Sequence, residues 1–217
     1  FVSNEKVYPM VIAQDHKRIF DGDAGPNTGG MGAYTPVPQI PEEAVQQAIS
    51  QVLKPTAKGM VAEKRPFQGI LYAGLIQTAT GPKVIEFNAR FGDPETQVVL
   101  ARLESPLSEI ISSLLAKEQP TIVWNELASV GVVVAAEGYP NQYKTNLPLP
   151  EMSGETIYYA GVTRSEQALV SAGGRIFLAE ATASTLEEAR KKVYQTLDNY
   201  SFPGMYYRKD IGVKGLI

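Results

Sequence analysis

Three polar side chains alternate along one stretch of the sequence, Lys83–Glu95. Glu86, Asn88 and Arg90 are spaced two residues apart, so an extended strand places them on one face, with neighbours about 7 Å apart. Carboxylate and carboxamide oxygens suit a hard divalent cation, and a guanidinium beside them suits a phosphate that the cation carries. The pattern predicts a site for a metal-bound phosphate. A half-exposed strand with a polar outer face is the alternative.

A helix start follows this strand directly. Asp93 suits the N-cap, Pro94 the first helical position and Glu95 the first turn. The positive end of a helix stabilises anionic groups close to it. The sequence therefore favours the phosphate site over a strand that is merely polar on its outer face.

A second stretch, Asp21–Tyr34, is rich in glycine. Glycines let the backbone approach a ligand closely, and successive N–H groups can form an anion nest. The stretch has neither the Gly-Lys-Ser/Thr of a P-loop nor the dinucleotide fingerprint. A ligand cradle and an exposed surface loop both remain open. Asp21 and Asp23 are accordingly either partners for an amine or solvated turn residues.

Composition limits the other functional classes. Cysteine is absent, which excludes disulfides and thiolate metal sites and is compatible with the cytoplasmic location that we expect. The single histidine argues against a His-based triad or zinc site. The formal charge of −3 argues against nucleic acid or an anionic membrane as partner. No stretch approaches the roughly 18 apolar residues of a membrane span.

Hydrophobic spacing and Gly/Pro punctuation predict strands and helices over residues 1–118. In order, they are a strand over 7–14, a long loop over 15–38, a helix over 41–62 perturbed at Pro55, a strand over 69–78 that turns at 80–82 into the Glu86 strand, and helices from Pro94 and Ser105. The strand over 69–78 is almost entirely apolar, which predicts a central strand covered on both faces.

A small α+β unit is predicted over residues 119–217. Its elements are a buried strand over 129–138, an irregular connection over 141–154, strands near 156–162, 168–171 and 175–181, and a helix from Thr185. Thr185 and Glu188 form a capping box, and apolar residues between Leu186 and Leu197 recur on one side of the helix.

These motifs together resemble the later part of the phosphoribosylamine–glycine ligase family, in the ATP-grasp superfamily. The matching segments are Gln14–Arg18, Gly25–Tyr34, Gly69–Gly74, Lys83–Thr96 and Tyr207–Gly212. The resemblance implies an α+β fold, with the second half of an ATP-grasp domain (an antiparallel sheet with helices) over 1–118 and a small α+β carboxy-terminal domain over 119–217. It also implies that the missing amino-terminal half of the same polypeptide precedes this chain, and that the fragment alone is inactive.

The resemblance implies a reaction as well. ATP, glycine and 5-phosphoribosylamine would give glycinamide ribonucleotide, ADP and phosphate through a glycyl phosphate, in purine biosynthesis. Glu86 and Asn88 would bind Mg²⁺ or Mn²⁺, and Arg90 would stabilise the transferring phosphoryl group. Asp93 and Glu95 would orient the glycine ammonium or the phosphoribosylamine.

The remaining substrate contacts that the resemblance implies come from the glycine-rich loop and from basic residues. They are Gly29, Gly30, Gly32, Arg175, Arg208 and Lys209, and Asp21 joins them as the candidate partner for an amine. The three basic residues are candidates for the ribose 5-phosphate, with surface solubility as the equal alternative.

Three other functions compete with this one. A sibling ATP-grasp ligase would share the Glu86 face, but we would not expect it to carry Gly25–Tyr34 in this form. A non-catalytic phosphosugar- or nucleotide-binding module would be expected to lose its metal ligands. A magnesium-dependent hydrolase would need a base for water, and no residue is an obvious one.

Overall fold

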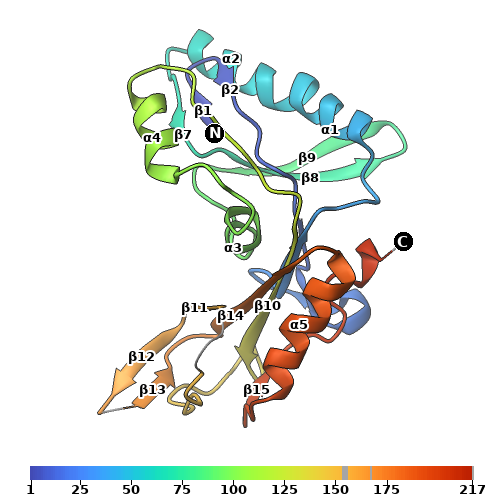
Figure 1. Ribbon diagram of the computed structural model, residues 1–217, viewed down its shortest axis with the longest axis vertical. Helices are drawn as coiled ribbons and strands as arrows, with labels where there is room; N and C mark the ends of the chain where they lie inside the picture. The colour runs from blue at the N-terminus through green and yellow to red at the C-terminus, as the bar shows by residue number, and fades with distance from the viewer. Residues whose placement is uncertain (153–155, 167, 217) are drawn as a thin grey trace. The chain divides into compact units, whose positions relative to one another are not determined.

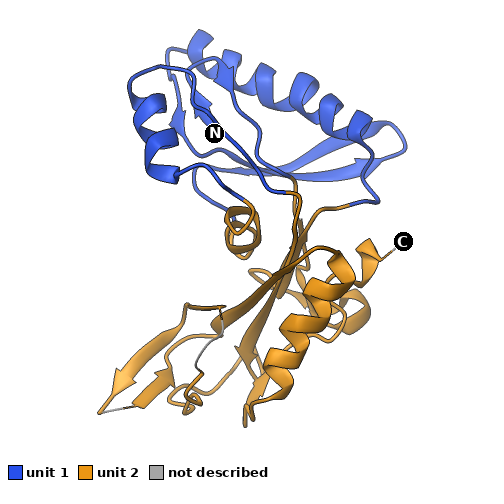
Figure 2. Cartoon of the chain, viewed as in Figure 1, with its two compact units in different colours: residues 1–11, 38–92, 103–125 blue, residues 12–37, 93–102, 126–217 orange. Residues whose placement is uncertain are grey.

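The computed structural model describes residues 1–152, 156–166 and 168–216 and combines helices with antiparallel sheets, which confirms the α+β class. The chain forms two compact units (Figure 2). Unit 1 comprises residues 1–11, 38–92 and 103–125, and unit 2 comprises residues 12–37, 93–102 and 126–217. Each unit therefore contains discontinuous segments. The boundary near residue 118 stays a prediction about the domains of the family.

Unit 1 contains a small three-stranded sheet, a long hairpin and three α-helices (Figure 1). Its strands are β1 (Val2–Ser3), β2 (Lys6–Val7), β7 (Gln68–Gly69), β8 (Tyr72–Thr78) and β9 (Gly81–Asn88), and its helices are α1 (Glu42–Ala48), α2 (Lys54–Ala62) and α4 (Leu107–Leu115). Strand β1 pairs with β2 and β7. Phe1, Ile110 and Leu114 form the centre of the buried core.

The helix predicted over 41–62 is confirmed, with an irregularity beside Pro55. Helices α1 and α2 are joined by a π-helical turn over Ile49–Leu53. Pro55 has no N–H to donate to the carbonyl of Gln51, four residues earlier, so the regular hydrogen-bond ladder is interrupted there. The widened turn lies directly before this interruption.

The hairpin predicted around residues 80–82 is confirmed, but the burial predicted for its first strand is wrong. In the described part of the chain, β8 pairs with β9 alone. Ile76 on β8 is 52% exposed, and Ile85 on the predicted apolar face of β9 is 67% exposed. A two-stranded ribbon has no further strands at its edges, so the apolar run does not become a central strand.

Unit 2 is built on a six-stranded antiparallel sheet, and two further pairs of strands, β4 with β5 and β12 with β13, lie outside this sheet. The strands described in the unit as a whole are β3 (Gln14–Asp15), β4 (Arg18–Phe20), β5 (Ala24–Asn27), β6 (Gly32–Thr35), β10 (Ala128–Ala136), β11 (Thr156–Tyr159), β12 (Val162–Ser165), β13 (Ala168–Ser171), β14 (Arg175–Ala183) and β15 (Met205–Tyr206), and its helices are α3 (Glu95–Leu100) and α5 (Leu186–Asp198). The main sheet has the order β11-β14-β10-β6-β3, with β15 also pairing with β10. Helix α5 packs on β10 and β14, as Figure 1 shows, and α3 packs on β6 and β10.

The carboxy-terminal elements largely follow the predictions. Every residue of β10 is buried. Thr185 Oγ1 accepts the Glu188 N–H at 3.2 Å, which confirms Thr185 as the N-cap of α5. Among the described helices, none has both the length and the apolar content that crossing a membrane requires.

Several predicted boundaries are wrong. The strand predicted over 7–14 forms only at its ends, in β2 and β3, and the loop predicted over 15–38 contains β4, β5 and β6. Strand β6 was not predicted, because it lies in a glycine-rich stretch and is defined by its pairing with the distant strand β10. This pairing runs from Thr35 opposite Ser129 to Gly32 opposite Val132. The strand predicted over 156–162 is interrupted after Tyr159. The connection predicted over 141–154 ends in residues outside the described ones.

Candidate active site

Strand β9 carries Glu86 and Asn88 on one face of the hairpin. Asn88 pairs with Tyr72, and Glu86 pairs with Gly74. The ladder shifts register only on the turn side of Glu86, so the two-residue alternation between Glu86 and Asn88 is intact. Glu86 is exposed and Asn88 is half-buried. Two oxygen donors therefore point the same way and are accessible.

This pair of donors fits a divalent cation that arrives with a phosphate. Among the described residues, no group of three or more His, Asp or Glu side chains could enclose a metal ion. Mg²⁺ is commonly held by one or two protein oxygens together with water and substrate phosphates. Glu86 and Asn88 supply the oxygens that this mode of binding requires.

Arg90 lies just beyond the end of β9. Its side chain is exposed, and its Nη1 donates to the carbonyl of Phe91 at 2.7 Å. A guanidinium has five N–H donors, so this local bond leaves most of them for a ligand. Its predicted contact with the transferring phosphoryl group stays a prediction.

Gly74 leaves space for the Glu86 side chain on the neighbouring strand. A Cβ atom at Gly74 would lie 3.0 Å from Glu86 Cγ and 3.4 Å from Tyr72 Cε1. Both separations are at or below ordinary contact distances between carbon atoms, so a methyl group would push the Glu86 stem aside.

We expect Gly74→Ala in the full-length protein to weaken Mn²⁺–ADP binding about tenfold, the order of effect seen when support around a metal ligand is changed. Titration calorimetry with Mn²⁺–ADP measures it. Gly59→Ala is the control, because a Cβ there would meet nothing within 4 Å. Equal affinity in both variants would contradict the role of Gly74.

In unit 2, Arg175 connects two predicted site segments. Its Nη2 donates to Asp93 Oδ2 at 3.0 Å, and its Nη1 donates to the carbonyl of Gly29 at 2.9 Å. Helix α3 begins at Glu95 with Pro94 at the N-cap and no side-chain cap. The N-cap prediction for Asp93 is therefore wrong, because its carboxylate is oriented toward Arg175.

The N–H groups of residues 28–31 all have acceptors within the protein. They are the Lys17 carbonyl for Thr28 (2.7 Å), the Tyr139 hydroxyl for Gly29 (3.0 Å), Thr28 Oγ1 for Gly30 (2.9 Å) and the His16 carbonyl for Met31 (2.8 Å). An anion nest needs unpaired N–H groups. The nest interpretation therefore does not apply to these four residues.

The loop glycines serve close packing instead. Gly30 has φ +115°, and a Cβ there would lie 2.4 Å from Pro94 Cδ and 2.7 Å from Asp15 Oδ1. Gly32 has φ +151°, and a Cβ there would lie 2.5 Å from the Gly131 carbonyl oxygen. Both positions require glycine for conformation and for space.

Two buried titratable residues lie next to each other at the end of β3. Burial, followed by the negative charge of Glu95, raises the pKa of Asp15 to about 7, although Lys17 Nζ lies 2.5 Å away and opposes the shift. Burial, followed by the positive charge of Arg208, lowers the pKa of His16 to about 4. Between about pH 4 and pH 7, native Asp15 therefore binds a proton that the unfolded chain has lost. Between about pH 4 and pH 6.5, native His16 lacks a proton that the unfolded chain binds.

These shifts act on stability in opposite directions. As pH falls from about 7 to 4, proton uptake by native Asp15 favours the folded state, whereas uptake by unfolded His16 between about 6.5 and 4 favours unfolding. Asp15→Asn removes the contribution of Asp15, so we expect only the destabilising contribution of His16 to remain. Its free energy of unfolding should then fall more steeply than that of the wild type over this range, by at most about 1.4 kcal/mol per pH unit. Urea titrations at several pH values measure this, and parallel curves would contradict it.

Arg208 is fully buried at the centre of an ion-pair network. Its Nε and Nη2 donate to the two carboxylate oxygens of Asp210, both at 2.7 Å, and its Nη1 donates to Asp23 Oδ1 at 3.0 Å and the Arg18 carbonyl at 2.9 Å. Four of its donors are therefore used within the protein. A phosphate contact from Arg208 would require this network to open, so that role stays a prediction.

Asp21 and Lys209 also connect the turn at residues 21–23 with the segment around Arg208. Asp21 Oδ1 accepts the Lys209 N–H at 2.8 Å, and the Lys209 ammonium, which is exposed, contacts Asp198 at 3.1 Å. The turn at residues 21–23 is thus bonded to residues 208–214. The two motifs at opposite ends of the sequence meet here.

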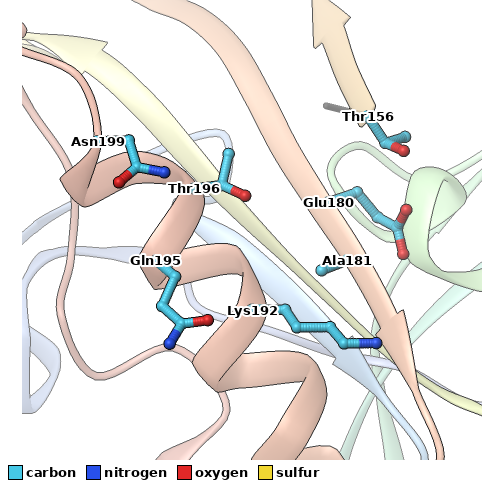
Figure 3. Close-up of a pocket in the computed structure, with 7 residues that line it drawn as sticks. All are labelled: Thr156, Glu180, Ala181, Lys192, Gln195, Thr196 and Asn199. Carbon is cyan, nitrogen blue, oxygen red and sulfur yellow. The ribbon is translucent and has the colours of Figure 1, made fainter. Parts of the chain in front are cut away.

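A polar hollow of about 380 Å³ lies in unit 2 between α5 and the paired strands β11 and β14 (Figure 3). Its lining residues are Thr156, Glu180, Ala181, Lys192, Gln195, Thr196 and Asn199. Glu180 accepts from Ser129 Oγ at 2.7 Å, and burial raises the pKa of its carboxyl. No predicted site residue lines this hollow.

Comparison with known families identifies the chain. The ATP-grasp (A) domain model of phosphoribosylglycinamide synthetase matches residues 1–96, and the C domain model of the same enzyme matches residues 129–214. The chain belongs to the phosphoribosylglycinamide synthetase family. The resemblance inferred from the sequence motifs is confirmed.

Relatives of this synthetase family cover the chain completely. The phosphoribosylamine–glycine ligase of Halalkalibacterium halodurans is 54% identical over 220 residues, which is all of this chain and 51% of the relative. The Lactococcus lactis ligase is 53% identical over all of this chain and 53% of its own length. The chain thus spans about half the length of the curated relatives it matches.

Solved structures place the chain in the same fold. The phosphoribosylamine–glycine ligase of Thermotoga maritima superposes with a TM-score of 0.89 at 32% identity, over 96% of this chain and 53% of that one. A biotin carboxylase domain from Hydrogenobacter thermophilus superposes with a TM-score of 0.59 at 17% identity, over 82% of this chain and 40% of that one. The predicted ATP-grasp architecture is confirmed.

Two residues that lie next to Gly29 and Gly30 in unit 2 were not predicted from the sequence. Asp15 belongs to the Gln14–Arg18 motif, which could have pointed to it, yet its contact with Gly30 depends on the fold. Tyr139 belongs to none of the motifs that carry the resemblance. Its hydrogen bond to Gly29 spans 110 positions in the sequence and has no local signature.

Proposed function

We propose that the full-length protein ligates glycine to 5-phosphoribosylamine with ATP, and forms glycinamide ribonucleotide, ADP and phosphate in purine biosynthesis. The observation that carries the proposal is the accessible pair of Glu86 and Asn88 on one face of β9, in a chain 54% identical to a phosphoribosylamine–glycine ligase. A cytoplasmic location suits these soluble metabolites.

The chemistry divides into two steps. A glycine carboxylate oxygen attacks the γ-phosphorus of ATP, the bond to the bridging oxygen of ADP breaks, and glycyl phosphate forms. The amine of phosphoribosylamine then attacks the glycyl carbonyl and loses a proton as phosphate leaves. Both steps concentrate negative charge on the phosphoryl oxygens, which the Arg90 guanidinium is suited to stabilise.

Glu86 and Asn88 would hold Mg²⁺ or Mn²⁺, which supplies charge neutralisation on the triphosphate when it is bound. Asp93 and Glu95 would orient the two amine substrates. Arg175 and Lys209, whose side chains retain some exposure, are the basic candidates most open to the ribose 5-phosphate. Arg208 would act through the network that orders the neighbouring segment.

The amino-terminal half of the relatives would complete the enzyme. The chain corresponds to 51–53% of these proteins. Exposed apolar side chains on β8 and β9 are consistent with further chain packing against the hairpin. We infer that this chain alone does not turn over and that the partner is the missing half of the same polypeptide.

The test is glycine-dependent ADP release by the full-length protein in the presence of ATP, Mg²⁺ and phosphoribosylamine. We expect release to require both amine substrates, and glycinamide ribonucleotide to accumulate in equal amount. ADP release with another amino acid, or another amine acceptor, at equal efficiency would favour the sibling-ligase alternative. Absence of any substrate-dependent release would favour a binding module.

A further inference from the structure

Two side chains from the carboxy-terminal part of unit 2 hold the backbone of Gly29. The Tyr139 hydroxyl accepts the Gly29 N–H at 3.0 Å, and Arg175 Nη1 donates to the Gly29 carbonyl at 2.9 Å. Both polar groups of this one residue are thereby satisfied. The conformation of the glycine-rich loop at this point is set from outside the loop.

The position of the Tyr139 ring is itself fixed. The ring packs on a buried cluster of Ile19, Met31 and Ala135. A Cβ atom at Gly174 would lie 2.2 Å from Tyr139 Cδ2, so glycine at this position provides the space that the ring occupies. Gly174, which directly precedes Arg175 in the chain, thus leaves room for the ring of Tyr139.

The pair also reaches the segment that follows β9. Arg175 Nη2 donates to Asp93 Oδ2 at 3.0 Å, and its Nη1 lies 3.2 Å from the Asp93 carbonyl. Gly29 and Asp93 are consequently held by one guanidinium. Their separation depends on the orientation of Arg175 and on the Gly29 peptide that Tyr139 anchors.

We propose that Tyr139 is a positioning residue for binding of the amine substrates, acting through the Gly29 backbone, with Arg175 as its partner. The inference rests on the proposed function, in which the loop at residues 29–32 borders the substrate pocket and Asp93 orients an amine. Tyr139 lies outside every segment that carries the sequence resemblance.

Tyr139→Phe in the full-length enzyme removes only the hydroxyl and retains the ring. We expect the KM for glycine, for phosphoribosylamine, or for both to rise about three- to tenfold, the effect of losing one neutral hydrogen bond. The KM for ATP should stay within about twofold, and the Tm within about 2 °C, because the packing of the ring is unchanged. Tyr143→Phe is the matched control, since the Tyr143 ring meets the Tyr139 ring edge-on, with centroids 6.0 Å apart.

Combining Tyr139→Phe with Arg175→Gln tests whether the two residues act together. We expect the double variant to raise KM by less than the product of the single effects, because both act on the same residue. Unchanged amine KM values in Tyr139→Phe, or an equal change in all three KM values with a lower Tm, would overturn the positioning role. A wild type without glycine-dependent ADP release would instead refute the proposed function, and the inference with it.

Discussion

Replacing Glu86 with alanine in the full-length enzyme is expected to lower kcat/KM for glycine-dependent ADP release at least about 100-fold, with a further loss when Asn88→Ala is added. The two residues offer oxygens on the same accessible face of β9. Removing one leaves a single protein ligand for a cation that otherwise relies on water and phosphate. Raised Mg²⁺ should restore part of the activity of each single variant.

The control for this prediction lies on the same hairpin. Gln77 on β8 is exposed, and within the described residues its side chain makes a local hydrogen bond alone, to the carbonyl of Thr78 at 3.3 Å. Gln77→Ala should therefore keep wild-type activity and the wild-type response to Mg²⁺. Wild-type turnover in the Glu86→Ala, Asn88→Ala double variant would remove the assignment of these residues as metal ligands.

Replacing Arg208 with alanine is expected to destabilise unit 2 by about 3 kcal/mol, at the lower end of the range for breaking a buried ion pair. The Arg208 side chain is fully buried, whereas the Asp210 and Asp23 side chains are 27% and 36% exposed, so solvent partly compensates the carboxylates that remain. Calorimetry should show a fall in Tm of about 10 °C.

Lys214→Ala provides the comparison, because Lys214 pairs with the same Asp23 but is 48% exposed. An exposed pair contributes less than about 1 kcal/mol, so its Tm should change little. Equal Tm values for the two variants would contradict the structural role of the buried network. The network also predicts acid sensitivity. Burial acts to raise the pKa of Asp210, but the hydrogen bonds that Asp210 accepts, first those from Arg208, outweigh burial and lower this pKa, so the stabilisation they provide is lost as pH falls below about 4.

The sequence predicted those elements whose signals are local. The capping of α5 by Thr185, the hairpin between β8 and β9, and the buried strand β10 each depend on residues close together in the chain. The alternation of Glu86 and Asn88 also followed from strand geometry, and the structure places them on one face.

The misses depend on contacts between distant segments. Strand β6 pairs with β10, and Tyr139 bonds to Gly29, at separations that hydrophobic spacing cannot show. Asp93 was a plausible N-cap until Arg175 supplied a stronger partner. The apolar run at residues 69–78 indicated burial, but an apolar run does not identify what lies against it.

The most direct test of the account is a structure of the full-length protein with Mg²⁺ and a non-hydrolysable ATP analogue. We expect the cation at about 2.1 Å from a carboxylate oxygen of Glu86 and from the side-chain oxygen of Asn88, and bound to the β- and γ-phosphates. A cation held at the phosphates by other residues, with Glu86 and Asn88 in contact only with solvent, would contradict it.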